Sequence, residues 1–306
     1  MVPARDAAGA RGGLLKPPFR TLISAAELVA LLPKSADLVI LDCGFDLADP
    51  LAGERAYAES HLPRALYAHL DRDLAGSKTG SNGRHPLPDR EQFAVRVGSW
   101  GIGPGTQVVA YDAQGGPYAA RAWWMLRWLG HEAAAVLDGG PAAWRSAGGE
   151  LVTGVVAPRT GGAYPWRPPD MPALDVTALQ SALARGEVRL VDARAPERYR
   201  GEVEPLDPVA GHIPGALNRF FKDNLDAAGR FKPAPVLREE FARIGVTGAS
   251  VGDAPVVPLV VHQCGSGVTA CHNLLAMAHV GLEGTVLYPG SWSEWCADPR
   301  RPVARG

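Results

Sequence analysis

The sequence lacks a long apolar run and an excess of charge of either sign. No stretch of its 306 residues approaches the roughly 20 apolar residues that a membrane-spanning helix needs, and the most apolar stretch, residues 119–129, contains Arg121 and Arg127. Lysine and arginine together number 31 and aspartate and glutamate 32, which gives a net charge of −1. This balance creates no overall attraction for nucleic acid or for an anionic membrane. We therefore expect neither of them as a partner.

Cysteine is also scarce. The four cysteines are Cys43, Cys264, Cys271 and Cys296, and no two are closely spaced. Disulfide frameworks and zinc sites generally use closely spaced cysteines, so the sequence predicts no disulfide scaffold, no metal and no cofactor. Residues 1–18 lack the apolar core of a signal peptide, and we expect them to form a flexible lead-in to a cytoplasmic protein.

The sequence does contain an internal repeat. A chain of 306 residues is too long for one ordinary core and fits two domains. Landmarks of the two halves recur at offsets of 150 to 152 residues, and these pairs are Asp42 and Asp192, His61 and His212, Asp112 and Cys264, Gly139 and Gly290, and Trp144 and Trp295. Five pairs in register indicate a duplicated domain, and the period is much longer than that of a solenoid.

The two copies are expected to be α/β domains covering residues 19–156 and 173–306. Apolar β-branched runs alternate with helical patterns, which predicts parallel sheets with helices on both faces. Residues 157–172 contain five prolines and two glycines and should form an extended linker. The expected strands are residues 106–111, 134–137, 258–263 and 285–288, and the expected helices are residues 119–129 and 268–280.

Cys264 stands where a site is expected in such a domain. It follows an apolar strand and precedes a loop that runs into the next helix, and ligands of open α/β sheets bind at this end of the strands. The loop residues are Gly265, Ser266, Gly267, Val268 and Thr269. Glycines allow a tight curl, and a helix N-terminus directs N–H groups toward an anion. We therefore expect Cys264 to be a thiolate nucleophile rather than a buried core cysteine.

A phosphatase nucleophile would occupy a similar loop. Such an enzyme places an arginine six residues after the cysteine, where its planar fork binds phosphate through two hydrogen bonds. The residue at this position is Ala270. The loop therefore suits a single sulfur atom better than a phosphoryl group.

The segment from Cys264 to Ala270 resembles the active-site loop of the 3-mercaptopyruvate sulfurtransferases, within the rhodanese superfamily. The resemblance covers nearly the whole chain, including both His-x-Pro segments and residues 192–194 and 290–295. It implies two tandem rhodanese-like, doubly wound domains, each with a central parallel sheet and helices on both faces. The second domain would be catalytic and the first a degenerate copy, with Asp112 where the second has Cys264.

The resemblance also implies how a substrate carboxylate is bound. Arg198 matches an arginine that the family uses for this purpose. Many members have a second arginine shortly before the second His-x-Pro segment, but here Leu206 stands at about that place. Arg219 or Lys222 could replace it.

A histidine of the first domain is a further residue that the resemblance implicates. His61 is expected to reach across the interface to Ser266, oriented by Asp49, or else only to stabilise the turn of its own His-x-Pro segment. The hydroxyl of Ser266 would donate to the sulfur donor, accept a relayed proton, or only support the loop. His212 is expected to be structural, as are three residues at strand ends, Asp42, Asp192 and Arg194.

The function implied is sulfur transfer from 3-mercaptopyruvate through a persulfide on Cys264, with ping-pong kinetics. The acceptor would be a small thiol, a dithiol protein or cyanide. Rhodaneses proper, which use thiosulfate, carry basic residues just after the cysteine, whereas this loop has Gly265 and Ser266. The alternatives are a thiosulfate:cyanide sulfurtransferase and a persulfide carrier with little turnover of small molecules. The sequence indicates neither the physiological acceptor nor the oligomeric state.

Overall fold

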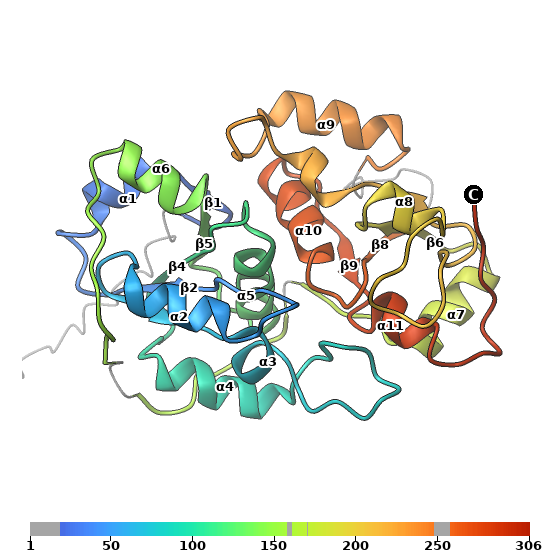
Figure 1. Cartoon of the computed structure of the whole chain (residues 1–306), viewed down its shortest axis with the longest axis horizontal. Helices are drawn as coiled ribbons and strands as arrows, with labels where there is room; N and C mark the ends of the chain where they lie inside the picture. Colours follow the sequence, from blue (N-terminus) through green and yellow to red (C-terminus); the bar gives the residue numbers. More distant parts are fainter. Residues whose placement is uncertain (1–18, 158–160, 170, 248–257) are drawn as a thin grey trace, which may run out of the picture.

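The computed structural model describes residues 19–157, 161–169, 171–247 and 258–306. The expected lead-in, residues 1–18, lies outside these ranges, and so does part of the expected linker. The two halves of the chain lie side by side, each built around its own sheet (Figure 1).

The first half contains a five-stranded sheet in the order β1-β5-β4-β2-β3, and all of its strand pairs are parallel. Its strands are β1 (Leu22–Ile23), β2 (Leu38–Asp42), β3 (Ala65–Tyr67), β4 (Gln107–Tyr111) and β5 (Ala134–Leu137). Its helices are α1 (Ala25–Leu31), α2 (Ala52–Glu59), α3 (Leu70–Asp73), α4 (Arg90–Ser99), α5 (Pro117–Trp128) and α6 (Gly140–Ser146).

The second half contains a four-stranded parallel sheet in the order β7-β6-β8-β9. Its strands are β6 (Val188–Asp192), β7 (Leu217–Asn218), β8 (Leu259–Gln263) and β9 (Thr285–Leu287). Its helices are α7 (Val176–Ala184), α8 (Pro196–Tyr199), the 3₁₀ helix η1 (Phe221–Asn224), α9 (Ala234–Arg243), α10 (Ala270–His279) and α11 (Ser291–Trp295).

The two sheets repeat one topology. Strands β3-β2-β4-β5 of the first correspond to β7-β6-β8-β9 of the second. The first sheet adds β1 beside β5, and the second has a single parallel bridge, from Ala173 to Leu287, at the equivalent edge. The alternating strands and helices predicted from the sequence are confirmed, with boundaries that differ by at most two residues.

Successive side chains of the buried strands point alternately to the two faces of each sheet, so the core is divided into layers. In β4, Val108 and Ala110 join one apolar cluster, whereas Val109 and Tyr111 join a second on the opposite face. Successive side chains of a strand point to opposite faces, so a strand with apolar residues at every position is covered on both sides. The second sheet follows the same rule, because Val260 and Val261 belong to different clusters.

One apolar cluster is shared by both halves. It contains Trp123 and Trp124 of α5 and Leu274 and Leu275 of α10, all of them buried. Helices α5 and α10 pack against each other between the two sheets (Figure 1). Because a fused apolar core is costly to open, this packing holds the two domains in a fixed relation.

The described part of the linker forms neither helix nor strand and lies along the first half. The buried Tyr164 donates its backbone N–H to Ala94 O, and its hydroxyl is 3.0 Å from His131 Nδ1.

Within the described residues, no helix has the length and the apolar character needed to cross a membrane.

Candidate active site

Cys264 follows the last residue of β8, one of the two inner strands of the second sheet. Its side chain is almost fully buried, and the loop after it leads into α10. The backbone N–H of Cys264 donates to Ser291 Oγ at 3.1 Å. Ser291 has a φ of 55° and donates its own hydroxyl to Tyr288 O, so a strained residue supports the backbone at the cysteine.

The loop after Cys264 is tightly curled. Gly267 has a φ of 77°, and a Cβ atom there would lie 2.3 Å from the carbonyl oxygen of Pro289, so only glycine fits. Within the described part of the chain, the backbone N–H groups of residues 265–269 donate no hydrogen bond to another protein atom. They remain available to an anion at the head of the loop.

The first domain shows how such a loop binds negative charge. Asp112 occupies the position of Cys264, and its carboxylate accepts four backbone hydrogen bonds. The donors, at 2.8 to 2.9 Å, are the N–H groups of Gln114, Gly116, Tyr118 and Ala119. Burial raises the pKa of Asp112, whereas these hydrogen bonds lower it. In the first domain, a side-chain carboxylate thus occupies the anion site of the loop.

Cys264 opens onto a cavity of about 350 Å³ between the two domains. Three basic side chains of the second domain line it, Arg194, Arg198 and Lys222. The remaining lining residues come from both halves of the chain and are Leu47, Arg84, Gln114, Pro117, Tyr118, Ala193, Ala195, Leu206, Phe220, Phe221, Gly265, Ser266, Val268 and Thr269. Cys264 therefore lies beside a cavity that has basic as well as apolar side chains in its lining, and not only within the apolar core.

The other three cysteines are buried and unreactive by environment. Burial raises the pKa of Cys271 to about 12 and that of Cys296 to about 11. It raises the pKa of Cys43 as well. A thiol with a raised pKa stays protonated near neutral pH and is a poor nucleophile.

Ser266 contacts a histidine of the first domain. The Nδ1 atom of His85 lies 2.7 Å from Ser266 Oγ, although the two residues are 181 positions apart. On the other side of the ring, Nε2 lies 3.6 Å from Asp71 Oδ1, and Asp71 also binds Lys78. Burial lowers the pKa of His85 to about 3, so its imidazole is neutral at physiological pH. A serine, a neutral histidine and a carboxylate are thus arranged in series beside Cys264.

The sequence-based expectation for His61 is wrong. The ring of His61 stacks on Tyr57 with centroids 4.2 Å apart, and its Nδ1 lies 2.7 Å from Tyr57 O. His212 does the same with Tyr199, at 3.8 Å and 2.7 Å. The histidine of each His-x-Pro segment therefore binds within its own domain, and Ser266 contacts His85 instead.

The expected role of Asp49 is wrong for a related reason. Asp49 is exposed and forms an ion pair with Arg55 on the surface of the first domain. The carboxylate that faces a site histidine is that of Asp71, at the start of α3.

His85 lies in residues 74–89, which connect α3 to α4 and which we call the crossing loop. It extends from the first domain toward α11 of the second and returns to α4 (Figure 1). The backbone N–H of Arg84 donates to Ser293 Oγ at 3.0 Å. The fully buried Arg121 of α5 donates to Leu74 O and His85 O in the first domain and to Gly267 O in the second. The crossing loop is therefore held against the loop of Cys264.

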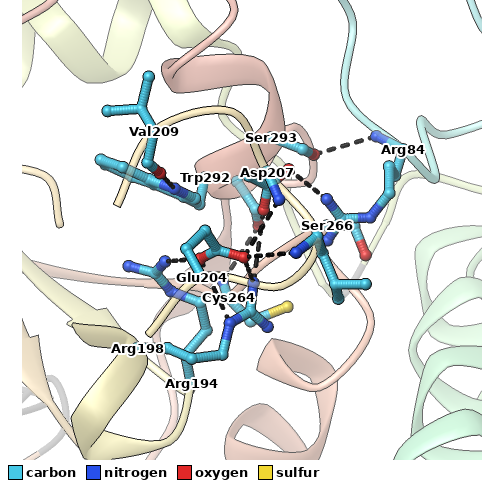
Figure 2. Close-up of polar contacts among 12 residues, drawn as sticks. Arg84, Arg194, Arg198, Glu204, Asp207, Val209, Cys264, Ser266, Trp292 and Ser293 are labelled. Atoms are coloured by element: carbon cyan, nitrogen blue, oxygen red, sulfur yellow. Dashed lines mark hydrogen bonds and ion pairs between the residues drawn. The ribbon is translucent and has the colours of Figure 1, made fainter. Parts of the chain in front are cut away.

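Arg198, the expected carboxylate-binding residue, lines the cavity, but its guanidinium is already paired with carboxylates of the protein. It donates to Glu204 at 2.6 Å and lies 3.4 Å from Asp207 Oδ2. Asp207 also binds Arg84 of the crossing loop (Figure 2). Burial raises the pKa of Asp207, and the charge of Arg84 opposes this increase.

Three further basic residues lie near the site, and they are Arg194 and the two candidates for a second cation, Arg219 and Lys222. Arg194 donates to the buried Asp192 at 2.7 Å and stacks on Trp292, which agrees with a structural role for both. Arg219 binds Glu240 and does not line the cavity, whereas Lys222 does.

Among the described residues, no group of three or more His, Cys, Asp and Glu side chains could hold a metal ion.

A model of the rhodanese-like domain matches residues 24–147 and again residues 175–298. The chain belongs to the rhodanese family. It is 48% identical over 287 residues to a probable 3-mercaptopyruvate sulfurtransferase of Pseudomonas aeruginosa, covering 93% of this chain and 98% of that protein. It is 37% identical over 301 residues to human 3-mercaptopyruvate sulfurtransferase, covering 94% and 96% of the two chains.

Solved structures of the rhodanese family match the fold over nearly the full length. The 3-mercaptopyruvate sulfurtransferase of Leishmania major superimposes with a TM-score of 0.79 at 29% identity. The match covers 93% of this chain and 76% of that chain.

Sequence reasoning missed three residues of this rhodanese-family site, namely Asp71, Arg84 and His85. All three belong to α3 or to the crossing loop, which have no counterpart among the repeat landmarks. The sequence did contain one signal for the crossing loop, its length of 16 residues, because so long a loop inside a compact domain usually has a function.

Proposed function

We propose that this protein is a sulfurtransferase that takes a sulfur atom from 3-mercaptopyruvate onto Cys264 and passes it to a thiol, a dithiol protein or cyanide. The observation that carries the proposal is the position of Cys264, at the head of a loop with unpaired N–H groups and beside a basic cavity. The names of the two similar proteins from Pseudomonas aeruginosa and human support the choice of donor. All four cysteines are free and buried, which suits the reducing cytoplasm.

In the first half-reaction the thiolate of Cys264 attacks the sulfur of 3-mercaptopyruvate. A sulfur–sulfur bond forms, the carbon–sulfur bond of the donor breaks, and its electron pair stays on carbon as the enolate of pyruvate. The enolate then takes a proton to give pyruvate, and the enzyme retains a persulfide. The N–H groups of residues 265–269 stabilise the negative sulfur on both sides of this step.

The pair formed by Ser266 and His85 is placed to manage the proton. The Ser266 hydroxyl is 2.7 Å from His85 Nδ1, and the neutral ring can accept a proton or deliver one through the hydroxyl. Asp71, on the far side of the ring, favours the form of His85 that accepts at Nδ1. We assign to this pair the transfer of the thiol proton of 3-mercaptopyruvate: the ring accepts it through the Ser266 hydroxyl and returns it by the same route to the enolate, which becomes pyruvate.

In the second half-reaction the acceptor attacks the outer sulfur of the persulfide. A bond forms between the acceptor and this sulfur, and the sulfur–sulfur bond breaks to restore the Cys264 thiolate. Since donor and acceptor react in turn at one sulfur atom, the kinetics should be ping-pong.

Replacement of the cysteine tests the proposal. We expect 3-mercaptopyruvate, given without an acceptor, to increase the mass of the protein by one sulfur atom and to release one pyruvate per chain. Cys264→Ser should do neither, whereas Cys271→Ser should do both. Full transfer by Cys264→Ser, or an unchanged mass of the wild-type protein, would contradict the proposal.

Thiosulfate is the alternative donor, and Lys222 in the cavity favours it because thiosulfate carries two negative charges. A comparison of kcat/KM for the two donors decides between them. We expect 3-mercaptopyruvate to be preferred, because Gly265 and Ser266 place no cation directly after the cysteine. Stable persulfide with negligible turnover of either donor would indicate a carrier instead.

A further inference from the structure

Two guanidinium groups from different domains meet over the residue that follows Cys264. A Cβ atom on Gly265 would lie 2.9 Å from Arg84 Nη2 and 3.6 Å from Arg198 Nη1. Arg198 comes from α8 of the second domain, and Arg84 comes from the crossing loop of the first. Both line the cavity of Cys264, so each can reach a ligand that lies over Gly265.

Arg198 cannot attract a carboxylate by itself. Its guanidinium contacts the carboxylates of both Glu204 and Asp207, whose side chains are only 3% exposed. Counted as ionised groups, these three side chains together carry one net negative charge. By themselves these three side chains would repel an anionic substrate, because charges a few ångströms apart in a partly buried site are weakly screened.

Arg84 neutralises this charge, because two guanidinium groups then face two carboxylates. One edge of its guanidinium, Nη1, binds Asp207 (Figure 2). On the opposite edge, Nε is buried without a hydrogen-bond partner among the described residues, and Nη2 faces Gly265. The Nε and Nη2 donors of an arginine lie side by side and match the two oxygens of a carboxylate.

We propose that Arg84 supplies the second cation for the carboxylate of the α-keto acid donor, binding it together with Arg198. This inference rests on the proposed function and adds to it a specificity residue contributed by the non-catalytic domain. Asp207, which lies between the two guanidinium groups, holds them in place and competes with the substrate for them. The position near Leu206 therefore needs no arginine, because the cation comes from the other domain.

Two donors that differ only in the carboxylate test this assignment. 3-Mercaptopyruvate carries the group, and mercaptoacetone has the same thiol and ketone without it. For Arg84→Gln we expect kcat/KM with 3-mercaptopyruvate to fall about 10- to 100-fold, mainly through KM, as a lost charge-assisted hydrogen bond predicts. The loss should exceed the loss with mercaptoacetone by at least about tenfold.

Two further variants separate recognition from folding. Arg84→Lys keeps the charge but not the fork, so it should recover part of the loss with 3-mercaptopyruvate. Arg55→Gln removes an arginine that is paired with Asp49 on the surface of the same domain, and it should leave both donors unaffected. Asp207→Asn should lower the KM for 3-mercaptopyruvate severalfold, because the competing charge is gone.

Equal losses with both donors in Arg84→Gln would show that the residue only positions the crossing loop, and no loss with either would remove it from the site. Either result overturns the inference while leaving Cys264 chemistry intact. If the wild-type protein turned over neither donor and formed no persulfide, the proposed function itself would fail.

Discussion

His85 and His61 illustrate two uses of a buried histidine in one domain. The ring of His85 contacts a serine of the other domain on one side and approaches a carboxylate on the other. The ring of His61 contacts its own chain four residues back and stacks on Tyr57. Only His85 has a nitrogen that faces a hydroxyl at the cavity, so only His85 can move a proton there.

This difference gives a prediction at the scale of the residue. His85→Gln should lower kcat about 100-fold or more, which is typical for the loss of a general acid or base. His61→Gln should leave kcat nearly unchanged and lower the free energy of unfolding by about 1–3 kcal/mol, since a buried hydrogen bond and a ring contact are lost. Steady-state kinetics and urea unfolding measure the two effects. A large fall of kcat in His61→Gln with normal stability would contradict the assignment.

At the scale of the element, the start of α5 is stabilised by the side-chain carboxylate of Asp112, which takes the place of a bound anion. The carboxylate of Asp112 accepts from four N–H groups of the loop and the first turn of α5, two of them buried, and a helix N-terminus by itself leaves such groups without partners. Among the described residues, the equivalent groups before α10 have no such acceptor, because Cys264 stands where the first domain has Asp112. The first domain therefore has internal hydrogen bonds at this loop that the second lacks.

We expect Asp112→Ala to lower the free energy of unfolding by about 3–5 kcal/mol, because several buried donors lose their acceptor at once. Asp226→Ala is the matched control, since Asp226 accepts hydrogen bonds from Ala228 and Arg230 in an exposed turn. Its effect should be much smaller, as water replaces the carboxylate. Urea unfolding followed by circular dichroism compares the two, and equal losses would contradict the explanation.

At the scale of the whole molecule, burial of neutral histidines makes stability depend on pH. Burial lowers the pKa of His262 to about 3 and that of His272 to about 4. In the unfolded chain a histidine titrates near 6.5. Below that pH the unfolded state therefore binds more protons than the folded state, and each such histidine reduces stability as the pH falls toward the folded value.

The prediction is that His262→Leu flattens this dependence. Its free energy of unfolding should fall less than that of the wild-type protein between pH 6.5 and pH 4, by up to about 1.4 kcal/mol per pH unit. The difference between the two proteins isolates the one histidine from the buried carboxylates that also titrate. Parallel curves in urea unfolding over this range would show that His262 is not buried as a neutral ring.

The local part of this protein was readable from its sequence. The duplicated order of strands and helices follows from short-range apolar periodicity, and the bounds of β5 and the positions of α5 and α10 agree with that reading. The loop of Cys264 was equally local, because a strand end, two glycines and a helix start are consecutive in the chain. The repeat even paired His61 with His212, whose structural role was already expected.

What only the tertiary structure decided is which groups of the first domain complete the site. Ser266 meets His85 across 181 positions, and Asp207 meets Arg84 across 123. These contacts exist because a shared core between α5 and α10 fixes two sheets in one relation, and a long loop without periodicity crosses between them. Periodicity reports what each element buries and carries no information on which loops of two separate domains come to face each other.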